Sequence, residues 1–229
     1  MMISIPKLKL FVKGVLSYFV LGNLKILAYI FKTDKLGHNY IPVYQRYLHE
    51  KRRKVRCVIE IGVGGYNNKL HGANSLRMWK RYFNNSLICG VDIEDKTHLE
   101  ERRIKIFHGN QTDQCFLERI VQKIPAPDII IDDGSHVCSD IISTFNFLFP
   151  TLNKGGIYFI EDTQTSYWKD FGGDPNNLDN PLTTMSFFLK KITDCVNHSE
   201  FSNKTNLPSF YNSIGHVNFY PKLIVISKV

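Results

Sequence analysis

Two pairs of adjacent carboxylates are the strongest chemical feature of this sequence, Asp132 with Asp133 and Glu161 with Asp162. Each pair follows a short apolar run, and His136 comes three residues after Asp133. Carboxylates held close together repel one another, so a site that gathers them needs a cation. The donors are hard oxygens without a cysteine cluster, which favours Mg²⁺ over Zn²⁺. The sequence therefore predicts a divalent metal site near His136.

The elements around these acids explain why the two pairs should meet. The apolar runs at 129–131 and 157–160 read as strands, and a helix-length segment with helical apolar spacing joins them. This is the pattern of a strand, a crossover helix and a second parallel strand. Because ligands bind at the carboxyl edge of an open parallel sheet, we expect both acid pairs and His136 at one ligand site.

A glycine-rich turn follows an earlier predicted strand at residues 55–61. Glu60, Gly62 and Gly64 form the pattern E-x-G-x-G, and glycines there let backbone amides approach a ligand closely. Tyr66 and Asn67 stand where the G-x-G-x-x-G turn would need glycine, which counts against a nicotinamide cofactor. We expect Asn74 or Ser75 to cap a helix that runs to about residue 82.

Three further acids have more than one interpretation. Asp92 ends the predicted strand 87–91, where a carboxylate can accept hydrogen bonds from two ribose hydroxyls. Asp113 follows the predicted strand 104–107 and the loop containing Gln111; it could cap a helix through Lys123 or contact an adenine. Asp132 is either a member of the ligand site or a residue that caps the following helix or orients a neighbour.

The end of the chain predicts a hairpin. After a helix at about 183–196, two β-like runs at 216–220 and 223–227 are separated by a two-residue connection, which makes them antiparallel. The whole pattern predicts an α/β fold, a Rossmann-like, mostly parallel seven-stranded sheet with an antiparallel last strand and helices on both faces. We expect residues 1–50 to form a helical addition with a loop over the cofactor and residues 51–229 to form the sheet domain.

Composition narrows the class of protein. The 229 residues, 43% of them hydrophobic, can bury one core, and the net charge of +8 is scattered apart from the run at 51–54, so we do not expect nucleic-acid binding. Five cysteines without C-x-x-C spacing favour a reduced, cytoplasmic setting.

The N-terminal residues leave several options open. The apolar stretch at 8–31 is interrupted by lysines, and the eleven residues between Lys13 and Lys25 are too few to cross a bilayer. It could pack on the domain, pack on a second subunit of a homo-oligomer, or lie peripherally on the inner face of the membrane. The polar segment 33–40 reads as a linker or a loop over a cofactor, and 44–50 as a short helix.

These motifs resemble those of class I S-adenosylmethionine-dependent methyltransferases, which share the terminal hairpin. More narrowly, the chain is similar to the metal-dependent sugar O-methyltransferases of macrolide antibiotic biosynthesis, of the mycinamicin and macrocin type. The resemblance extends from about Thr33 to the C-terminus. The matching motifs lie at residues 59–66, 75–80, 131–136 and 160–168.

The resemblance implies S-adenosyl-L-methionine and Mg²⁺ as cofactors and a sugar-containing small molecule or glycan as the acceptor. It implies Asp133, Glu161 and Asp162 as metal ligands, with His136 as the catalytic base and Asp133 beside it in the catalytic set. The cofactor-binding residues that we expect are Glu60, Gly62, Gly64, Tyr66, Ser75, Arg77, Asp92, Gln111, Asp113 and Asp132.

The chemistry accounts for these residue types. A sugar hydroxyl is a weak acid, and coordination to Mg²⁺ lowers its pKa while a histidine takes the proton. Tyr167 and Trp168 follow the second acid pair and form an acceptor wall or simply pack. A nicotinamide oxidoreductase and a non-catalytic, membrane-associated cofactor-binding protein are the alternative hypotheses.

Overall fold

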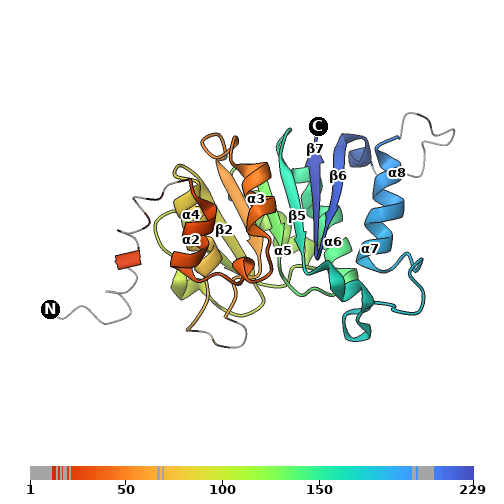
Figure 1. The fold of residues 1–229 in the computed structure, drawn as a ribbon, viewed down its shortest axis with the longest axis horizontal. Helices are drawn as coiled ribbons and strands as arrows, with labels where there is room; N and C mark the ends of the chain where they lie inside the picture. Colours follow the sequence, from red (N-terminus) through yellow and green to blue (C-terminus); the bar gives the residue numbers. More distant parts are fainter. Residues whose placement is uncertain are drawn as a thin grey trace.

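A seven-stranded sheet forms the centre of the computed structural model, which describes residues 12, 13, 15, 17, 20, 22–65, 68, 70–197, 200 and 209–229 (Figure 1). The strand order is β3-β2-β1-β4-β5-β7-β6. Only β7 runs antiparallel to its neighbours β5 and β6, which confirms the predicted fold class. The strands are β1 (Cys57–Ile61), β2 (Leu87–Asp92), β3 (Ile104–His108), β4 (Ile129–Asp132), β5 (Ile157–Glu161), β6 (Ile214–Tyr220) and β7 (Leu223–Lys228).

The central strands are buried on both faces, which is why they read as continuous apolar runs rather than as alternating ones. In β4, Ile129 and Ile131 face one core cluster while Ile130 faces the other. β-Branched side chains suit such strands because they pack well on a pleated surface.

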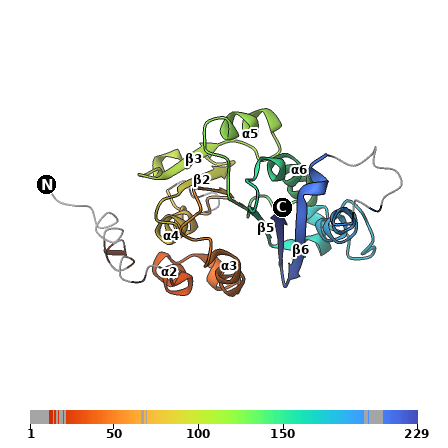
Figure 2. The ribbon, with the colours of Figure 1, turned by 90° about the horizontal axis from the view of Figure 1, so that it is seen from above.

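Helices cover both faces of the sheet (Figure 2). On one face lie α2 (Leu24–Phe31), α3 (Ile41–Leu48) and α4 (Asn74–Tyr82), whose buried residues share one core with that side of the strands. On the other face lie α5 (Gln114–Val121) and α6 (Cys138–Leu148). The shorter helices are η1 (Asp34–Leu36), η2 (Thr97–Leu99), η3 (Phe149–Thr151), η4 (Thr163–Tyr167), η5 (Lys169–Phe171) and η9 (Ser209–Ser213).

The helix predicted at 183–196 is an unbroken helical stretch of mixed type. It begins as α7 (Thr184–Ser186), passes through a π-helical segment, η6 (Phe187–Ile192), and ends as α8 (Thr193–Cys195). The Thr183 side chain accepts a hydrogen bond from Ser186 N and caps its start.

The N-terminal helices pack on the sheet domain. Leu24, Leu27 and Ala28 of α2 are fully buried in the same core as α4. The short helix predicted at 44–50 is α3, which begins earlier, at Ile41, because Pro42 suits the first turn of a helix. Most of the apolar stretch 8–31 before α2 lies outside the described residues; among those described, no helix is long and apolar enough to cross a membrane. The boundary at residue 50 stays a prediction.

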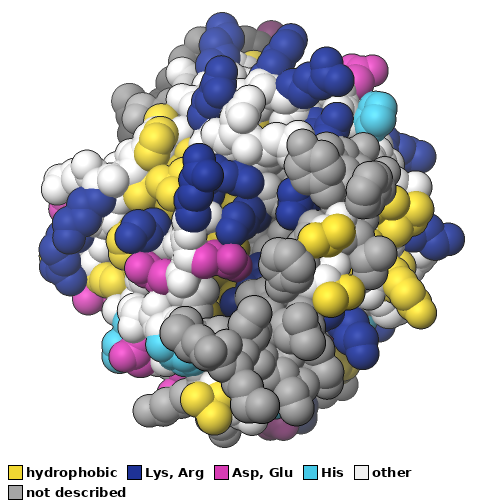
Figure 3. Space-filling view, turned by 90° about the vertical axis from the view of Figure 1, so that its left-hand side faces the viewer, with side chains coloured by type: hydrophobic (Ala, Val, Ile, Leu, Met, Phe, Trp, Pro, Cys, Tyr) yellow, Lys and Arg dark blue, Asp and Glu magenta, His cyan; other side chains and the backbone are white. Residues whose placement is uncertain are grey.

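The face on the side of α2 and α4 carries many lysine and arginine side chains among apolar ones (Figure 3). On α2, Ile26 and Tyr29 are exposed, and the basic residues Lys25 and Lys32 flank them.

Candidate active site

The register of the sheet brings the two acid pairs together. Asp132 of β4 pairs with Ile160 of β5 in a parallel ladder, so Asp133 and Glu161 follow at neighbouring strand ends. A cavity of about 430 Å³ lies at this carboxyl edge of the sheet, lined among others by Asp133, His136 and Asp162 but not by Glu161. Of the two predicted acid pairs, one member of each, Asp133 and Asp162, meets His136 at this cavity.

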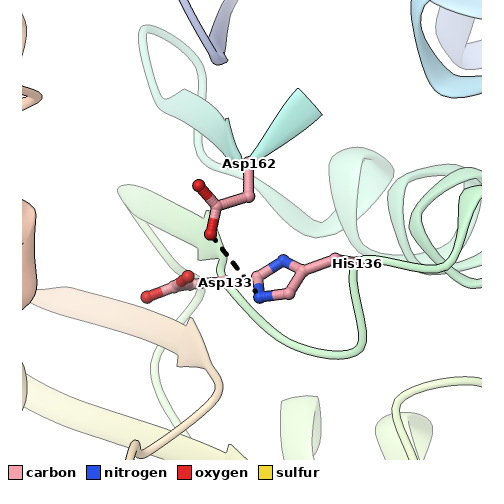
Figure 4. A group of neighbouring side chains, drawn as sticks. All are labelled: Asp133, His136 and Asp162. Atoms are coloured by element: carbon pink, nitrogen blue, oxygen red, sulfur yellow. Dashed lines mark ion pairs between the residues drawn. The ribbon is translucent and has the colours of Figure 1, made fainter. Parts of the chain in front are cut away.

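Asp133, His136 and Asp162 form a compact group, each offering one ligand atom within 4.8 Å of the others (Figure 4). His136 Nε2 lies 3.7 Å from Asp162 Oδ2, and its Nδ1 is buried without a hydrogen-bond partner among the described residues. His136 and Asp162 both have positive φ, 58° and 53°. Such backbone conformations are costly for non-glycine residues and are common at functional sites.

Three neighbours fix the orientation of Asp162. Tyr40 OH donates to Asp162 Oδ1 at 2.7 Å, Gln164 Nε2 donates to the same oxygen at 3.2 Å, and His38 Nδ1 lies 3.4 Å from it. Burial alone would raise the pKa of Asp162, but these hydrogen bonds and the two nearby histidines hold it below its usual value. Oδ2 is left on the side of His136, as Figure 4 shows.

Glu161 points to the other side of the strand end. Its carboxyl is buried, and Oε1 receives hydrogen bonds from Lys35 Nζ at 2.7 Å and from Tyr44 OH. Burial and the Asp133 charge raise its pKa well above the ordinary value, against the lowering effect of Lys35. Glu161, predicted as a metal ligand, is thus not in the compact group formed by Asp133, His136 and Asp162 in the described structure.

A buried lysine stands among these acids. Lys35 is fully buried, and its Nζ lies 2.7 Å from Asp133 Oδ2, 2.7 Å from Glu161 Oε1 and 3.0 Å from Glu60 Oε1. Burial would lower the pKa of Lys35, but the three carboxylates together raise it well above its ordinary value. The sequence predicted only a divalent ion as the neutralising charge; the structure adds this ammonium group.

The glycine turn lies directly against the acidic edge. Gly62 has φ +89°, and a Cβ there would lie 2.0 Å from the Asp133 carbonyl oxygen, so only glycine fits. Gly62 and Gly64 both line the cavity, as predicted for residues that approach a ligand. Tyr66 lies outside the described residues.

Asp92 and Gln111 also line the cavity. Asp92 Oδ2 accepts from Val63 N at 2.8 Å, which ties the end of β2 to the glycine turn. Gln111 Oε1 accepts from Ser135 N at 2.8 Å, and its Nε2 donates to Thr144 Oγ1 at 3.0 Å. These hydrogen bonds hold the two side chains in place at the wall of the cavity.

The other predicted cofactor residues have structural partners. Ser75 Oγ donates to Glu60 Oε2 at 2.8 Å, and both belong to the network around Lys35. Arg77 Nε lies 2.9 Å from Glu101 Oε1 and its NH1 donates to Gly72 O. Among the described residues that line the cavity, Glu60, Ser75 and Arg77 do not occur.

Asp113 and Asp132 are likewise engaged. Asp113 Oδ1 accepts from Phe116 N at 3.0 Å, so the interpretation of Asp113 as the cap of α5 is confirmed. Asp132 is buried against Tyr158 OH and Gln111 Nε2, and burial raises its pKa to about 7. Neither side chain is among the described residues that line the cavity.

The solved structures that resemble this chain carry the same fold. MycE methyltransferase from the mycinamycin biosynthetic pathway, in complex with Mg and SAH, matches with a TM-score of 0.85 and 37% identity over 90% of this chain and 54% of that one. The MycE complex with Mg, SAH and mycinamycin VI matches with a TM-score of 0.81 and 35% identity, over the same shares of the two chains. This chain has the class I S-adenosylmethionine-dependent methyltransferase fold.

Curated relatives of this methyltransferase-fold chain act on sugars of natural products. It is 39% identical over 199 residues to 8-demethyl-8-alpha-L-rhamnosyl tetracenomycin-C 2'-O-methyltransferase of Streptomyces olivaceus, covering 86% of this chain and 52% of that protein. It is 40% identical over 186 residues to mycinamicin VI 2''-O-methyltransferase of Micromonospora griseorubida, covering 80% and 46%. The chain spans about half the length of these relatives. No family model matches it.

The residues at the edge of this methyltransferase fold suit a hard divalent cation. Two carboxylates and an imidazole converge on the cavity, and the imidazole leaves a buried Nδ1 unsatisfied among the described residues. None of the five cysteines belongs to this group, and its two carboxylates offer the hard oxygen ligands that Mg²⁺ prefers.

The sequence offered residues 33–40 as a linker or as a loop over a cofactor, but it did not identify the residues of the segment 34–44 that contact the site. Asp34 and His38 line the cavity, while Lys35, Tyr40 and Tyr44 bind the acids at the ends of β4 and β5. The one available signal was electrostatic. Lys35 precedes Asp133 by about a hundred positions, but buried carboxylates need a positive partner and a lysine can provide one.

Proposed function

We propose that this chain is an Mg²⁺-dependent S-adenosylmethionine O-methyltransferase acting on a sugar hydroxyl of a glycan or of a glycosylated natural product. One observation carries the proposal: Asp133, His136 and Asp162 converge in a single cavity with the glycine turn. The relatives named for sugar O-methylation support the reaction class.

The cofactor end of the cavity is formed by Gly62, Gly64, Asp92 and Gln111. Gly62 and Gly64 keep the turn close to the ligand space, and Asp92 presents carboxylate oxygen at the end of β2, where ribose hydroxyls bind in such folds. S-adenosylmethionine supplies an electrophilic methyl group when it is bound there.

Asp133 and Asp162 offer carboxylate oxygens at the acceptor end. Glu161 is a further predicted ligand, although Lys35 and Tyr44 already occupy its Oε1. When Mg²⁺ is bound, it lowers the pKa of a coordinated hydroxyl and orients it.

His136 is the base in this proposal. Its side chain lines the cavity, and Nε2 lies on the side of the carboxylates, where it can take the proton that the hydroxyl loses. Asp162 Oδ2, 3.7 Å away, stabilises the imidazolium that results. The hydrogen bond from Thr165 Oγ1 to the His136 carbonyl, 2.8 Å long, fixes the position of this residue.

Tyr167 and Trp168 are proposed to contact the acceptor. They are 43% and 50% exposed and lie at the end of η4, the short helix that follows the strand carrying Glu161. Exposed aromatic rings of this kind stack on the apolar faces of sugars and aglycones.

Two measurements test the function. Calorimetric titration should show binding of S-adenosylmethionine and none of NAD, because the turn lacks the third glycine of a pyrophosphate-binding loop. Methyl transfer should then be measured on rhamnosylated aromatic and macrolide acceptors, with the matching aglycones as controls. Transfer to the glycosides alone supports the proposal; binding of NAD in place of S-adenosylmethionine contradicts it.

We also propose a cytoplasmic location, supported by the five unpaired cysteines, with contact between α2 and an anionic membrane surface. Tyr29 and Ile26 are 75% and 41% exposed there, flanked in the sequence by Lys25 and Lys32. Flotation with anionic vesicles should carry the protein and neutral vesicles should not. Sedimentation distinguishes the alternative, a homo-oligomer formed through the same helix.

A further inference from the structure

Four carboxyl groups and one ammonium group meet in the acidic cluster. Glu60, Asp133, Glu161 and Asp162 are four carboxylates, and Lys35 is the cation in contact with three of them. All except Asp162 reach Lys35, whereas Asp133 and Asp162 belong to the group around His136. The cluster therefore has an inner half, centred on Lys35, and an outer half that faces the cavity.

Asp133 belongs to both halves. Its Oδ2 accepts a hydrogen bond from Lys35 Nζ at 2.7 Å, and the same residue is one of the three that converge at the cavity. A carboxylate shared between two cation positions is the arrangement of two-metal sites, in which the ions lie about 3.5–4 Å apart. Here one of the two positions is filled by a side chain.

Lys35 cannot take the place of the catalytic base. It is fully buried, and as an ammonium group it carries donors and no acceptor. Its contacts are ion pairs with the acids, at 2.7 to 3.0 Å, so it acts on the site through their charge. Lys35 is a buried side chain of η1, so its positive charge is present whether or not a metal ion is bound.

We infer that Lys35 permanently occupies the inner of two cation positions in the acidic cluster, so that the protein takes a single divalent ion, at the outer position. The inference rests on the proposed metal site. Lys35 is then a positioning residue that sets metal stoichiometry, and its removal leaves a space lined by Glu60, Asp133 and Glu161 that a second ion can enter.

The test is the number of Mn²⁺ ions bound per full chain, measured by equilibrium dialysis and by electron paramagnetic resonance. Wild type should bind one ion, even at millimolar Mn²⁺, and Lys35→Ala should bind two, with a spin-coupled signal. Two matched controls should stay at one: Lys80→Ala removes a lysine paired with Glu101, and Tyr44→Phe removes an uncharged donor to Glu161.

The outcomes separate the inference from the function. Two ions on wild type would overturn the inference without any variant, and so would one ion or none on a folded Lys35→Ala protein. A Lys35→Ala protein that is folded only in the presence of Mn²⁺ and then holds two ions supports it. Absence of Mn²⁺ from wild type would instead remove the proposed metal site, and the inference with it.

Discussion

The carboxyl edge of β4 and β5 and the segment 34–44 contribute to the same site in different ways. The strand ends supply the residues proposed to bind the metal and to accept the proton, Asp133, His136 and Asp162, which lie in one compact group. The N-terminal segment supplies groups that hold them, with Lys35 on Asp133 and Tyr40 on Asp162. The positions of the proposed reacting groups are thus set by the sheet. The charges that balance them come from a segment that is distant in the sequence.

The largest expected effect lies at the strand ends. His136→Ala should lower turnover by about 10² to 10⁴, the usual contribution of a general base, with the Kd for S-adenosylmethionine unchanged. His38→Ala is the matched control, because His38 also contacts Asp162 but comes from the N-terminal segment. Steady-state kinetics and calorimetry measure both. Equal losses of turnover in the two variants would contradict the assignment of catalysis to the strand ends and of support to the N-terminal segment.

A second test concerns two neighbouring acids. Asp133→Asn should weaken Mn²⁺ binding by at least about 100-fold, more than the loss typical of residues behind the ligands. Asp132→Asn should leave the Kd for Mn²⁺ nearly unchanged, because Asp132 is buried against Tyr158 and Gln111. Titration with Mn²⁺ compares them, and a similar loss for Asp132→Asn would place that residue in the metal site.

A smaller effect is expected in the supporting segment. Tyr40→Phe removes the 2.7 Å hydrogen bond that orients Asp162 and should weaken Mn²⁺ binding by about 10-fold. Tyr47→Phe is the control, since the Tyr47 hydroxyl bonds Tyr220 instead. Unchanged Mn²⁺ affinity in Tyr40→Phe would mean that the segment does not organise the ligands.

The smallest effect separates two acids of the sheet edge. Asp113→Ala should cost about 1 kcal/mol of unfolding free energy through the lost cap of α5, with cofactor affinity unchanged. Asp92→Ala should instead weaken S-adenosylmethionine binding, because Asp92 lines the cavity. Denaturant unfolding and calorimetry give both quantities. Weaker S-adenosylmethionine binding by Asp113→Ala would instead support the interpretation that Asp113 contacts the adenine.

Local pattern was enough to predict the sheet. The apolar runs before Asp132 and Glu161 and the glycine turn after β1 predicted parallel strands, and the short connection at Pro221 and Lys222 predicted the reversal of β7. These signals lie within single elements, where side-chain periodicity and turn chemistry act directly. The meeting of the acids then follows from the topology of parallel strands.

The supporting contacts could not be predicted in the same way. Lys35 lies in a polar stretch that reads as a linker or as a loop over a cofactor, and its partners lie far along the chain. Burial of a lysine depends on which acids surround it in three dimensions, and a single sequence carries no local mark of that. The opposite orientations of Glu161 and Asp162 likewise depend on backbone geometry, because Asp162 adopts positive φ beyond the strand.

The most direct test of the central claim is methyl transfer under chelation. Single-turnover transfer from S-adenosylmethionine to a rhamnosylated acceptor should be followed with the protein stripped by EDTA and then titrated with Mg²⁺. The account predicts that transfer is lost in the stripped protein and returns with added Mg²⁺, while S-adenosylmethionine still binds throughout. Transfer at the same rate in the stripped protein would contradict it.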